Sequence, residues 1–276
     1  ITMSVRMWYI SVPIKDGRVV SLIHKYLRSG VMNRGLFETS TEGTPQGGPL
    51  SPLLSNIMLN ELDKELESRG HPFVRYADDA LIFCKSKRAA QRVKESITRF
   101  IEGQLFLKVN REKTVVSYVQ GVKFLGYSFY VMKGKCLLTV HPQSKSKMKF
   151  KLKELTSRSN GWGYECRKQK LRKYIRGWLG YYHLAQIKRL CLETDEWLRR
   201  RIRMCIWKSW KNPKTRVANL KKCGVLDWQA YQWGNTRLGY WRVALSRLLT
   251  FAMSNDKLRR AGYASLMDYY LEWYPK

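Results

Sequence analysis

Two short apolar runs separated by a pair of acids constrain the fold of this chain most strongly. Residues 73–76 (FVRY) and 81–84 (LIFC) are rich in aromatic and branched side chains, a composition that favours β-strands. Ala77, Asp78 and Asp79 lie between them, so we predict a hairpin whose tight connection carries both acids. The other elements of the chain can be placed relative to this hairpin.

The adjacent carboxylates of Asp78 and Asp79 allow two interpretations. Two like charges at a hairpin tip repel each other, so a cation beside them would stabilise the fold. Hard divalent ions such as Mg²⁺ prefer oxygen ligands of this kind, and pairs of such ions serve phosphoryl or nucleotidyl transfer. In a protein taken at random, an Asp-Asp pair is more often a solvated turn that accepts backbone hydrogen bonds. The pair alone does not distinguish these two possibilities.

Three further motifs accompany the acidic pair along the chain. They are residues 43–56 (GTPQGGPLSPLLSN) upstream, and residues 110–114 (NREKT) and 122–127 (VKFLGY) downstream. With residues 76–79 (YADD), their order and spacing resemble the palm of reverse transcriptases encoded by bacterial and organellar group II introns. The resemblance covers roughly residues 15–250, and four motifs in one order are far more specific than any single one.

This resemblance implies an RNA-directed DNA polymerase, a nucleotidyltransferase that uses two Mg²⁺ ions, an RNA template, a DNA primer and dNTPs. Asp78 and Asp79 would be its catalytic and metal-binding residues. In the family, the positions of Gln46 and Gly47 lie beside the template base and the incoming nucleotide, and that of Lys113 lies near the nucleotide phosphates. The strand pair beginning at residues 124–127 would hold the primer's 3′ end. The substrate-binding residues implied in this way are Tyr76, Gln46, Gly47, Lys113, Leu125 and Gly126.

One departure from the family concerns the third carboxylate of the two-metal site. By the family's spacing it should lie at or just before residue 1, and residues 1–14 contain no Asp or Glu. Asp16 does not replace it, because its Lys-Asp-Gly context matches a loop before a helix. The fingers region that normally precedes the palm is also missing. We therefore expect the chain to be the C-terminal part of a larger protein, with an incomplete Mg²⁺ site.

The charge of the chain points to a polyanionic partner. With 52 Lys and Arg against 21 Asp and Glu, the net charge is +31, which makes nucleic acid the first candidate partner and an anionic membrane surface the second. Residues 1–140 hold 21 basic and 12 acidic side chains, whereas residues 141–276 hold 31 and 9, together with nine of the ten Trp. We therefore place a domain boundary at 140/141.

The apolar pattern predicts an α+β fold class for residues 1–140. Helices are expected from Asp16 to Gly30, over 51–66 and over 87–100, with a loop over 31–48 between the first two. A strand is expected at 105–109, and a hairpin over 129–140 turns at residues 133–135. This is a polymerase palm, an antiparallel sheet with packed helices. The acids of the second helix are expected to be solvated: Glu61, Asp63, Glu65 and Glu67.

Residues 141–276 are predicted to be all-α, and by resemblance they form a thumb followed by a maturase domain that binds intron RNA and assists its splicing. Their helices combine basic residues with Trp, Tyr and Leu, so we expect the apolar sides to pack together and the basic sides to face phosphate. Most of the nine Trp should then be buried. The candidate RNA-binding residues are Lys149, Lys151, Lys153, Arg172, Lys173, Arg176, Arg199, Arg200, Arg201 and Arg203.

Other function classes are disfavoured by what the sequence lacks. The six Cys include no Cys-x-x-Cys pair, which argues against a zinc site or a disulfide framework. No stretch is apolar enough to span a bilayer, and the sequence does not begin with a signal-peptide pattern, so we expect a bacterial cytoplasmic or organellar protein that is not secreted. A basic protein of the membrane surface is disfavoured by the distribution of Trp.

Three hypotheses remain open. The chain is a polymerase whose missing parts lie elsewhere, a catalytically inactive maturase remnant that still binds intron RNA, or a degenerate remnant of a mobile element. An upstream coding region with fingers and a further acid would favour the first.

Overall fold

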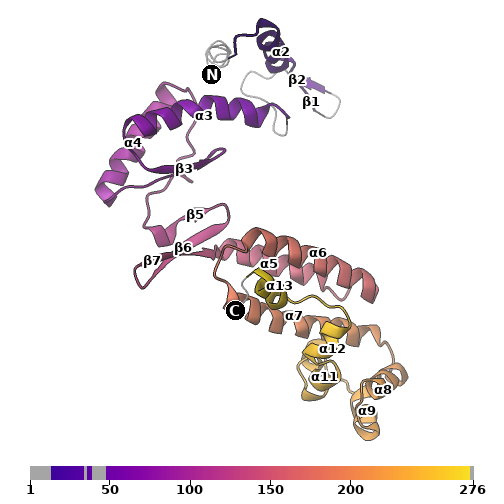
Figure 1. Ribbon diagram of the computed structural model, residues 1–276. Helices are drawn as coiled ribbons and strands as arrows, with labels where there is room; N and C mark the ends of the chain where they lie inside the picture. The colour runs from indigo at the N-terminus through magenta and orange to yellow at the C-terminus, as the bar shows by residue number, and fades with distance from the viewer. Residues whose placement is uncertain (1–13, 34–35, 39–47, 274–276) are drawn as a thin grey trace. The chain divides into compact units, whose positions relative to one another are not determined.

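The computed structural model describes residues 14–33, 36–38 and 48–273, and they form two compact units that divide after Tyr118 (Figure 1). The segments with Gln46, Gly47 and residues 1–13 lie outside the described residues. Each unit is treated separately below.

The first unit contains three long helices: α2 (Gly17–Arg28), α3 (Ser51–Ser68) and α4 (Lys87–Gly103). All three occur where the apolar periodicity predicts them. Asp16 caps α2 by accepting a hydrogen bond from the amide of Arg18 at 2.8 Å, and Ser86 caps α4 by accepting one from Ala89 at 3.2 Å. Short polar side chains thus fix the starts of two of these helices.

The described strands of the first unit pair as two hairpins. β1 (Val31–Asn33) pairs with β2 (Leu36–Glu38), and β3 (Phe73–Tyr76) pairs with β4 (Asp79–Ile82), both antiparallel. The prediction of a loop over 31–48 therefore missed one short hairpin. The predicted strand at 105–109 is wrong, because this segment is irregular and Phe106 has a φ of 52°, outside the extended region.

The acidic hairpin packs against the two helices that flank it in sequence. Leu62 and Leu66 of α3, Ile97 of α4 and Leu105 form a buried cluster, and Phe73 and Ile82 of the hairpin contact this cluster. These two hairpin residues are opposite each other in the ladder, so one face of the hairpin is covered. Val74, on the other face, is 49% exposed.

The second unit begins with a short 3₁₀ turn at Val119–Gly121 and a three-stranded antiparallel sheet. Its strands are β5 (Lys123–Phe124), β6 (Tyr127–Met132) and β7 (Lys135–Val140), in that spatial order. The predicted turn between β6 and β7 is confirmed: Lys133 and Gly134 have φ values of 51° and 74°, as a tight hairpin connection requires.

Helices make up the described chain from Pro142 to Trp273. They are α5 (Pro142–Leu155), α6 (Tyr164–Tyr182), α7 (Lys188–Ser209), α8 (Pro213–Lys222), α9 (Asp227–Gly234), α10 (Tyr240–Val243), α11 (Arg247–Ala252), α12 (Asn255–Arg260) and α13 (Leu266–Trp273). In Figure 1, α5, α6 and α7 lie side by side, and their buried side chains form one core with those of the shorter helices.

The Trp residues of the second unit are less buried than expected. Of the eight whose side chains the structure describes there, Trp207 and Trp210 are buried, Trp228 and Trp241 are exposed, and the other four are half-buried against the core. The periodic spacing of aromatic residues thus overestimates their burial, because large rings reach the rim of a core as well as its centre.

The molecule is therefore mixed α+β, mostly helical with small antiparallel sheets. Within the ranges that the structure describes, there is no helix with the length and apolar character needed to cross a membrane.

The turn between β5 and β6 is fixed by the end of α6. Leu125 and Gly126 both have positive φ, 50° and 80°. The carbonyl of Leu125 accepts a hydrogen bond from the Tyr181 hydroxyl at 2.9 Å, and that of Gly126 accepts one from the Ser144 hydroxyl at 3.1 Å. A Cβ atom on Gly126 would lie 2.4 Å from the Tyr182 hydroxyl, and three neighbouring rings hold Tyr182 in place.

This close approach predicts a large cost for Gly126→Ala. The matched control is Gly134→Ala, because Gly134 also has a positive φ but has nothing within 4 Å of an added Cβ. The left-handed backbone should lower the free energy of unfolding by about 1 kcal/mol in both variants. Overpacking should lower it by about 1–3 kcal/mol more in Gly126→Ala. Urea unfolding followed by Trp fluorescence measures the difference, and equal losses for both variants would contradict the packing role of Gly126.

Candidate functional site

The acidic pair lies where the hairpin prediction puts it. Ala77 and Asp78 form a two-residue connection between β3 and β4, with a φ of 50° at Ala77, and Tyr76 pairs with Asp79. Asp79 is therefore the first residue of a strand and not part of the turn. Phe83 donates its amide to the carbonyl of Pro72 at 2.9 Å, which extends the ladder by one bond. Tyr76, Asp78 and Asp79 are all exposed, so both carboxylates are accessible to a ligand.

Arg75 anchors the hairpin to helix α3. Its guanidinium makes two hydrogen bonds to the Asp63 carboxylate, from Nε to Oδ1 at 2.7 Å and from Nη2 to Oδ2 at 2.5 Å. Its Nη1 also donates to Asn56 Oδ1 at 2.9 Å and to the carbonyl of Ala77 in the turn at 3.0 Å. One side chain thus connects the helix to the main chain beside Asp78, and the expectation that Asp63 is solvated is wrong.

The electrostatics of this anchor extend to the acidic pair. The hydrogen bonds that Arg75 donates to Asp63 raise the pKa of Arg75, burial opposes this effect, and the charges of Asp63 and Asp78 raise the pKa further. Asp78 also accepts a hydrogen bond from the Ser55 hydroxyl of α3 at 3.0 Å. The position of the Asp78 carboxylate is therefore set by α3 on one side and by the anchored turn on the other.

The oxygen ligands of this site suit a hard cation in kind but not in number. Asp78 and Asp79 are adjacent, and Asp63 is engaged by Arg75. Within the described part of the chain there is no group of three or more His, Cys, Asp or Glu side chains that could hold a metal ion. The assignment of Asp78 and Asp79 as metal ligands therefore stays a prediction.

The predicted substrate-binding residues are divided between the two units. Tyr76 belongs to the hairpin, and Lys113 lies in an exposed turn whose start is closed by Asn110, which accepts the Lys113 amide at 3.1 Å. Leu125 and Gly126 form the β5–β6 turn of the second unit, and Gln46 and Gly47 are outside the described residues. The roles of these residues stay predictions.

The predicted RNA-binding residues fall into two groups. The exposed group is Lys149 and Lys153 of α5 and Arg172, Lys173 and Arg176 of α6. Lys151 is half-buried and pairs with Glu154 at 2.9 Å. The acids of these two helices, Glu154 and Glu165, pair with Lys151 and Lys168, so the exposed basic side chains remain candidates for phosphate contacts.

The four predicted arginines of α7 form the second group, and each donates hydrogen bonds to other groups of the protein. Arg199 and Arg203 are only 4% and 7% exposed, so the expectation that these basic side chains face outward does not hold for them. Arg203 donates to the carbonyl of Met253 at 2.9 Å and to Asn255 Oδ1 at 2.9 Å. Arg199 donates to the carbonyl of Tyr263 at 3.5 Å.

The other two predicted arginines of this helix are also engaged. Arg201 donates to the Thr156 hydroxyl at 2.6 Å and to the carbonyls of Lys153 and Thr156 at 3.0 Å. Arg200 donates to the carbonyl of Trp241 at 3.0 Å and lies over the ring of Trp241. Burial lowers the pKa of Arg199, Arg201 and Arg203, as expected for cations removed from water.

Sequence reasoning missed the residues that position the acidic hairpin: Arg75, Asp63 and Ser55. A signal for the first two was present, because Asn56 and Asp63 are seven residues apart and therefore share one face of α3. An Arg within a strand that precedes an acidic turn can bond to such a face. The hydrogen bond from Ser55 to Asp78 has no comparable sequence signal.

Comparison with known families divides the chain into two segments. Residues 4–129 match the family "Reverse transcriptase (RNA-dependent DNA polymerase)", and residues 145–224 match "Group II intron, maturase-specific domain". The predicted domain boundary at 140/141 lies between these two matches. The compact units of the structure instead divide after Tyr118, because the β5–β7 sheet bonds to α5 and α6.

Individual relatives include a group II intron-encoded protein and a retron reverse transcriptase. Protein YkfC of Escherichia coli strain K12 is 33% identical over 41% of this chain and 39% of its own length. The group II intron-encoded protein LtrA of Lactococcus lactis subsp. cremoris is 29% identical over 44% of this chain and 31% of its own length. The retron Mx65 reverse transcriptase of Myxococcus xanthus is 39% identical over 26% of this chain and 17% of its length. The matched regions thus cover less than half of each relative.

The Arg75 anchor predicts strong coupling between α3 and the hairpin. In a double-mutant cycle of Arg75→Ala and Asp63→Ala, the coupling free energy should be about 1.5–3 kcal/mol, the size of charge-assisted hydrogen bonds in a partly buried pair. Amide hydrogen exchange of β3 and β4 measures the opening free energy locally.

The control for this cycle is the pair of Arg111 and Glu102, which is 3.1 Å apart with side chains 78% and 36% exposed. An exposed pair of this kind should couple by less than about 1 kcal/mol. If the two cycles give the same coupling, Arg75 does not anchor the hairpin.

Proposed function

The chain belongs to the group II intron reverse transcriptase and maturase family, with a reverse transcriptase domain followed by a maturase-specific domain, and on this basis we propose its function. The proposed activity is RNA-directed DNA synthesis by two-Mg²⁺ nucleotidyl transfer, combined with binding of intron RNA and assistance to its splicing. It would act where introns of this kind are transcribed, in a bacterial cytoplasm or an organelle.

The observation that carries the catalytic part is the anchored, exposed acidic pair. Asp78 is positioned by Ser55 and by the turn that Arg75 holds, and Asp79 is its neighbour at the start of β4. In the proposed reaction these two carboxylates hold Mg²⁺ together with a third acid that is not among the described residues. Bound Mg²⁺ would neutralise phosphate charge and lower the pKa of the primer 3′ hydroxyl.

The roles left to the protein are positioning and charge neutralisation, which supply most of the acceleration in phosphoryl-type transfer. The primer 3′ hydroxyl loses its proton, its oxygen attacks the α-phosphate of the dNTP, and the bond from that phosphorus to the oxygen bridging to the β-phosphate breaks, so that pyrophosphate leaves. Gln46 and Gly47 contact the template base and the nucleotide, Lys113 contacts its phosphates, and Leu125 and Gly126 support the primer end. These assignments follow the family resemblance residue by residue.

The RNA-binding part rests on the exposed basic side chains of α5 and α6. Their charges are held on rigid helices whose opposite sides are buried, as with Leu152 of α5 and Leu171 and Ile175 of α6. Binding of this kind uses phosphate contacts and RNA shape, and it depends strongly on salt.

A second candidate function is that of a catalytically inactive, truncated maturase that only binds RNA. The observation that favours it is that the described residues contain no cluster of three possible metal ligands. The two functions differ in one property, since only the first predicts DNA synthesis.

Primer extension on an RNA template with Mg²⁺ distinguishes them. For a polymerase, Asp78→Asn should reduce extension at least about a hundredfold, because a metal-binding carboxylate is lost. The control is Asp256→Asn, since this carboxylate is 79% exposed in the second unit. Extension that disappears only in the Asp78 variant supports the polymerase. No extension by the wild-type chain, together with tight and salt-sensitive RNA binding, supports the inactive maturase.

The two groups of basic residues should behave differently in RNA binding. Lys173→Ala with Arg176→Ala removes two exposed charges, so the slope of log affinity against log salt should become shallower by about 2. Filter binding to structured intron RNA at several salt concentrations measures this slope.

Arg203→Ala should instead destabilise the fold by about 2–4 kcal/mol, because the buried carbonyl of Met253 and the part-buried bond to Asn255 lose their donor. Thermal unfolding followed by Trp fluorescence tests this prediction. A stable Arg203→Ala variant with reduced RNA affinity would show that Arg203 contacts RNA and has no essential structural role.

A further inference from the structure

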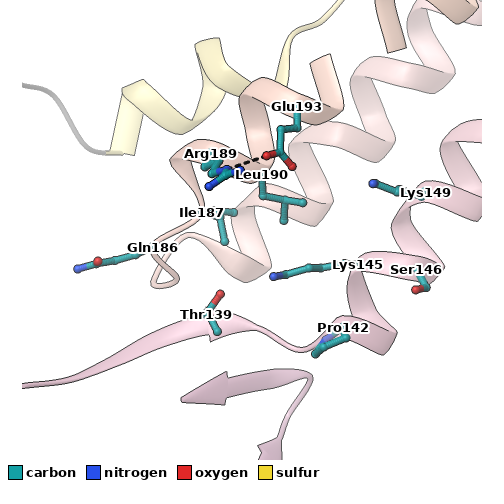
Figure 2. Close-up of a pocket in the computed structure, with 10 residues that line it drawn as sticks. All are labelled: Thr139, Pro142, Lys145, Ser146, Lys149, Gln186, Ile187, Arg189, Leu190 and Glu193. Atoms are coloured by element: carbon teal, nitrogen blue, oxygen red, sulfur yellow. Dashed lines mark hydrogen bonds and ion pairs between the residues drawn. The ribbon is translucent and has the colours of Figure 1, made fainter. Parts of the chain in front are cut away.

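A pocket of about 570 Å³ lies within the second unit, at the end of β7 and the starts of α5 and α7 (Figure 2). Its lining includes Thr139 of β7, Lys145 and Lys149 of α5, and Ile187 and Leu190 at the start of α7. In Figure 2, the amino ends of Lys145 and Lys149 extend from α5 toward α7. The volume is within the range of small-molecule sites, which is roughly 300–1,000 Å³.

The charge lining this pocket is positive. Lys145, Lys149 and Arg189 contribute three cations, and the one acid, Glu193, is bound to Arg189 at 2.7 Å. The pKa of the neighbouring His141 is lowered, first by burial and then by the charges of Lys123 and Lys145. The net positive charge of the lining favours an anion over a cation as the ligand.

Two helix starts add to this positive potential. Both α5 and α7 begin at the pocket, and α7 is a helix of 22 residues. Ile187 precedes α7 and provides no side-chain cap for its first amides. The partial positive charge at a helix start favours an anion, and here it adds to the lysine charges.

The pocket is fixed by hydrogen bonds between its walls. The amide of Gln186 donates to the carbonyl of Leu138 at 2.9 Å, and the Tyr130 hydroxyl donates to Gln186 Oε1 at 2.9 Å. These bonds tie the connection between α6 and α7, and with it the start of α7, to the β-sheet, so this side of the pocket is preformed.

The pocket is larger than an anion alone requires. Pro142, Ile187 and Leu190 contribute apolar surface beside the lysines. A ligand that combines a phosphate with a ribose and base would use both the charged and the apolar parts of the lining.

We propose that this pocket binds one nucleotide unit, with its phosphate between Lys145 and Lys149 and its ribose or base against Leu190. The inference rests on the RNA-binding function proposed above and deepens it, because it names a defined subsite where the family resemblance gives only a basic surface. The nucleotide could belong to an RNA strand or be free in solution, and the test below separates these sources.

The test follows the backbone amides of Arg189 and Leu190 by NMR in the full chain. The added ligands are inorganic phosphate, adenosine 5′-monophosphate and a short single-stranded RNA, with chloride at equal ionic strength as the reference. We expect saturable shifts of these amides with the three phosphate-bearing ligands and none with chloride. Shifts with RNA alone assign the site to the strand, and shifts with the monophosphate as well show that one unit suffices.

Matched variants on α5 and α7 sharpen the test. Lys145→Gln and Lys149→Gln should each weaken binding about tenfold, the effect of one charge-assisted hydrogen bond. Lys147→Gln is the control, because Lys147 is exposed on the same helix but does not line the pocket. Glu193→Gln should tighten binding, since it releases Arg189 from its carboxylate.

Two results would overturn the proposed nucleotide site. One is amide shifts that chloride reproduces, and the other is equal weakening of ligand binding by Lys147→Gln and Lys145→Gln. Structured RNA binding that persists without any pocket shift would reject the pocket and leave the proposed function intact. Pocket shifts with the monophosphate in a chain that binds no structured RNA would reject the maturase function and leave the pocket intact.

Discussion

Hydrogen bonds from basic side chains to carbonyls at helix ends hold the second unit together. The last carbonyls of a helix have no partner within it and carry partial negative charge. Arg201 donates to a carbonyl at the end of α5, Arg203 donates to one at the end of α11, and Lys257 donates to one at the end of α8. Residues 141–276 hold 31 basic and only 9 acidic side chains. Guanidinium groups can be buried there because carbonyls at helix ends replace the missing carboxylates as hydrogen-bond acceptors.

The first unit uses a different solution for the same problem. Arg75 has a carboxylate partner, Asp63, and with it connects α3 to the turn that carries Asp78. Asp195 in the second unit is the converse case, an acid that binds the amides of Leu266 and Met267 at the start of α13, while burial raises its pKa. Charged side chains in this protein thus hold neighbouring elements together as well as setting the charge of its surface.

Whether a feature could be predicted depends on how far apart in the sequence its interacting residues lie. The helices, the acidic hairpin and the turn at Lys133 and Gly134 could be predicted, since periodicity and turn chemistry are local. The strand expected at 105–109 failed because Phe106 adopts a positive φ that alternation does not encode. The inward direction of Arg199 and Arg203 was also beyond the sequence, because their acceptors lie about 50 or more residues away in the chain. Predictions from pattern were thus reliable for elements and unreliable for partners.

Because Arg199 and Arg203 of α7 are bonded within the protein, the formal charge of the chain differs from the number of its cations that can contact RNA. Formal charge counts every Lys and Arg, whereas the number of counterions that RNA releases depends only on cations that can reach its phosphates. Arg199 and Arg203 add to the long-range field that attracts a polyanion, yet their donors are already bound to the protein's own main chain. In the proposed RNA binding, more charges would therefore attract the polyanion than contact its phosphates, which predicts fast encounter and a smaller thermodynamic salt effect than the composition suggests.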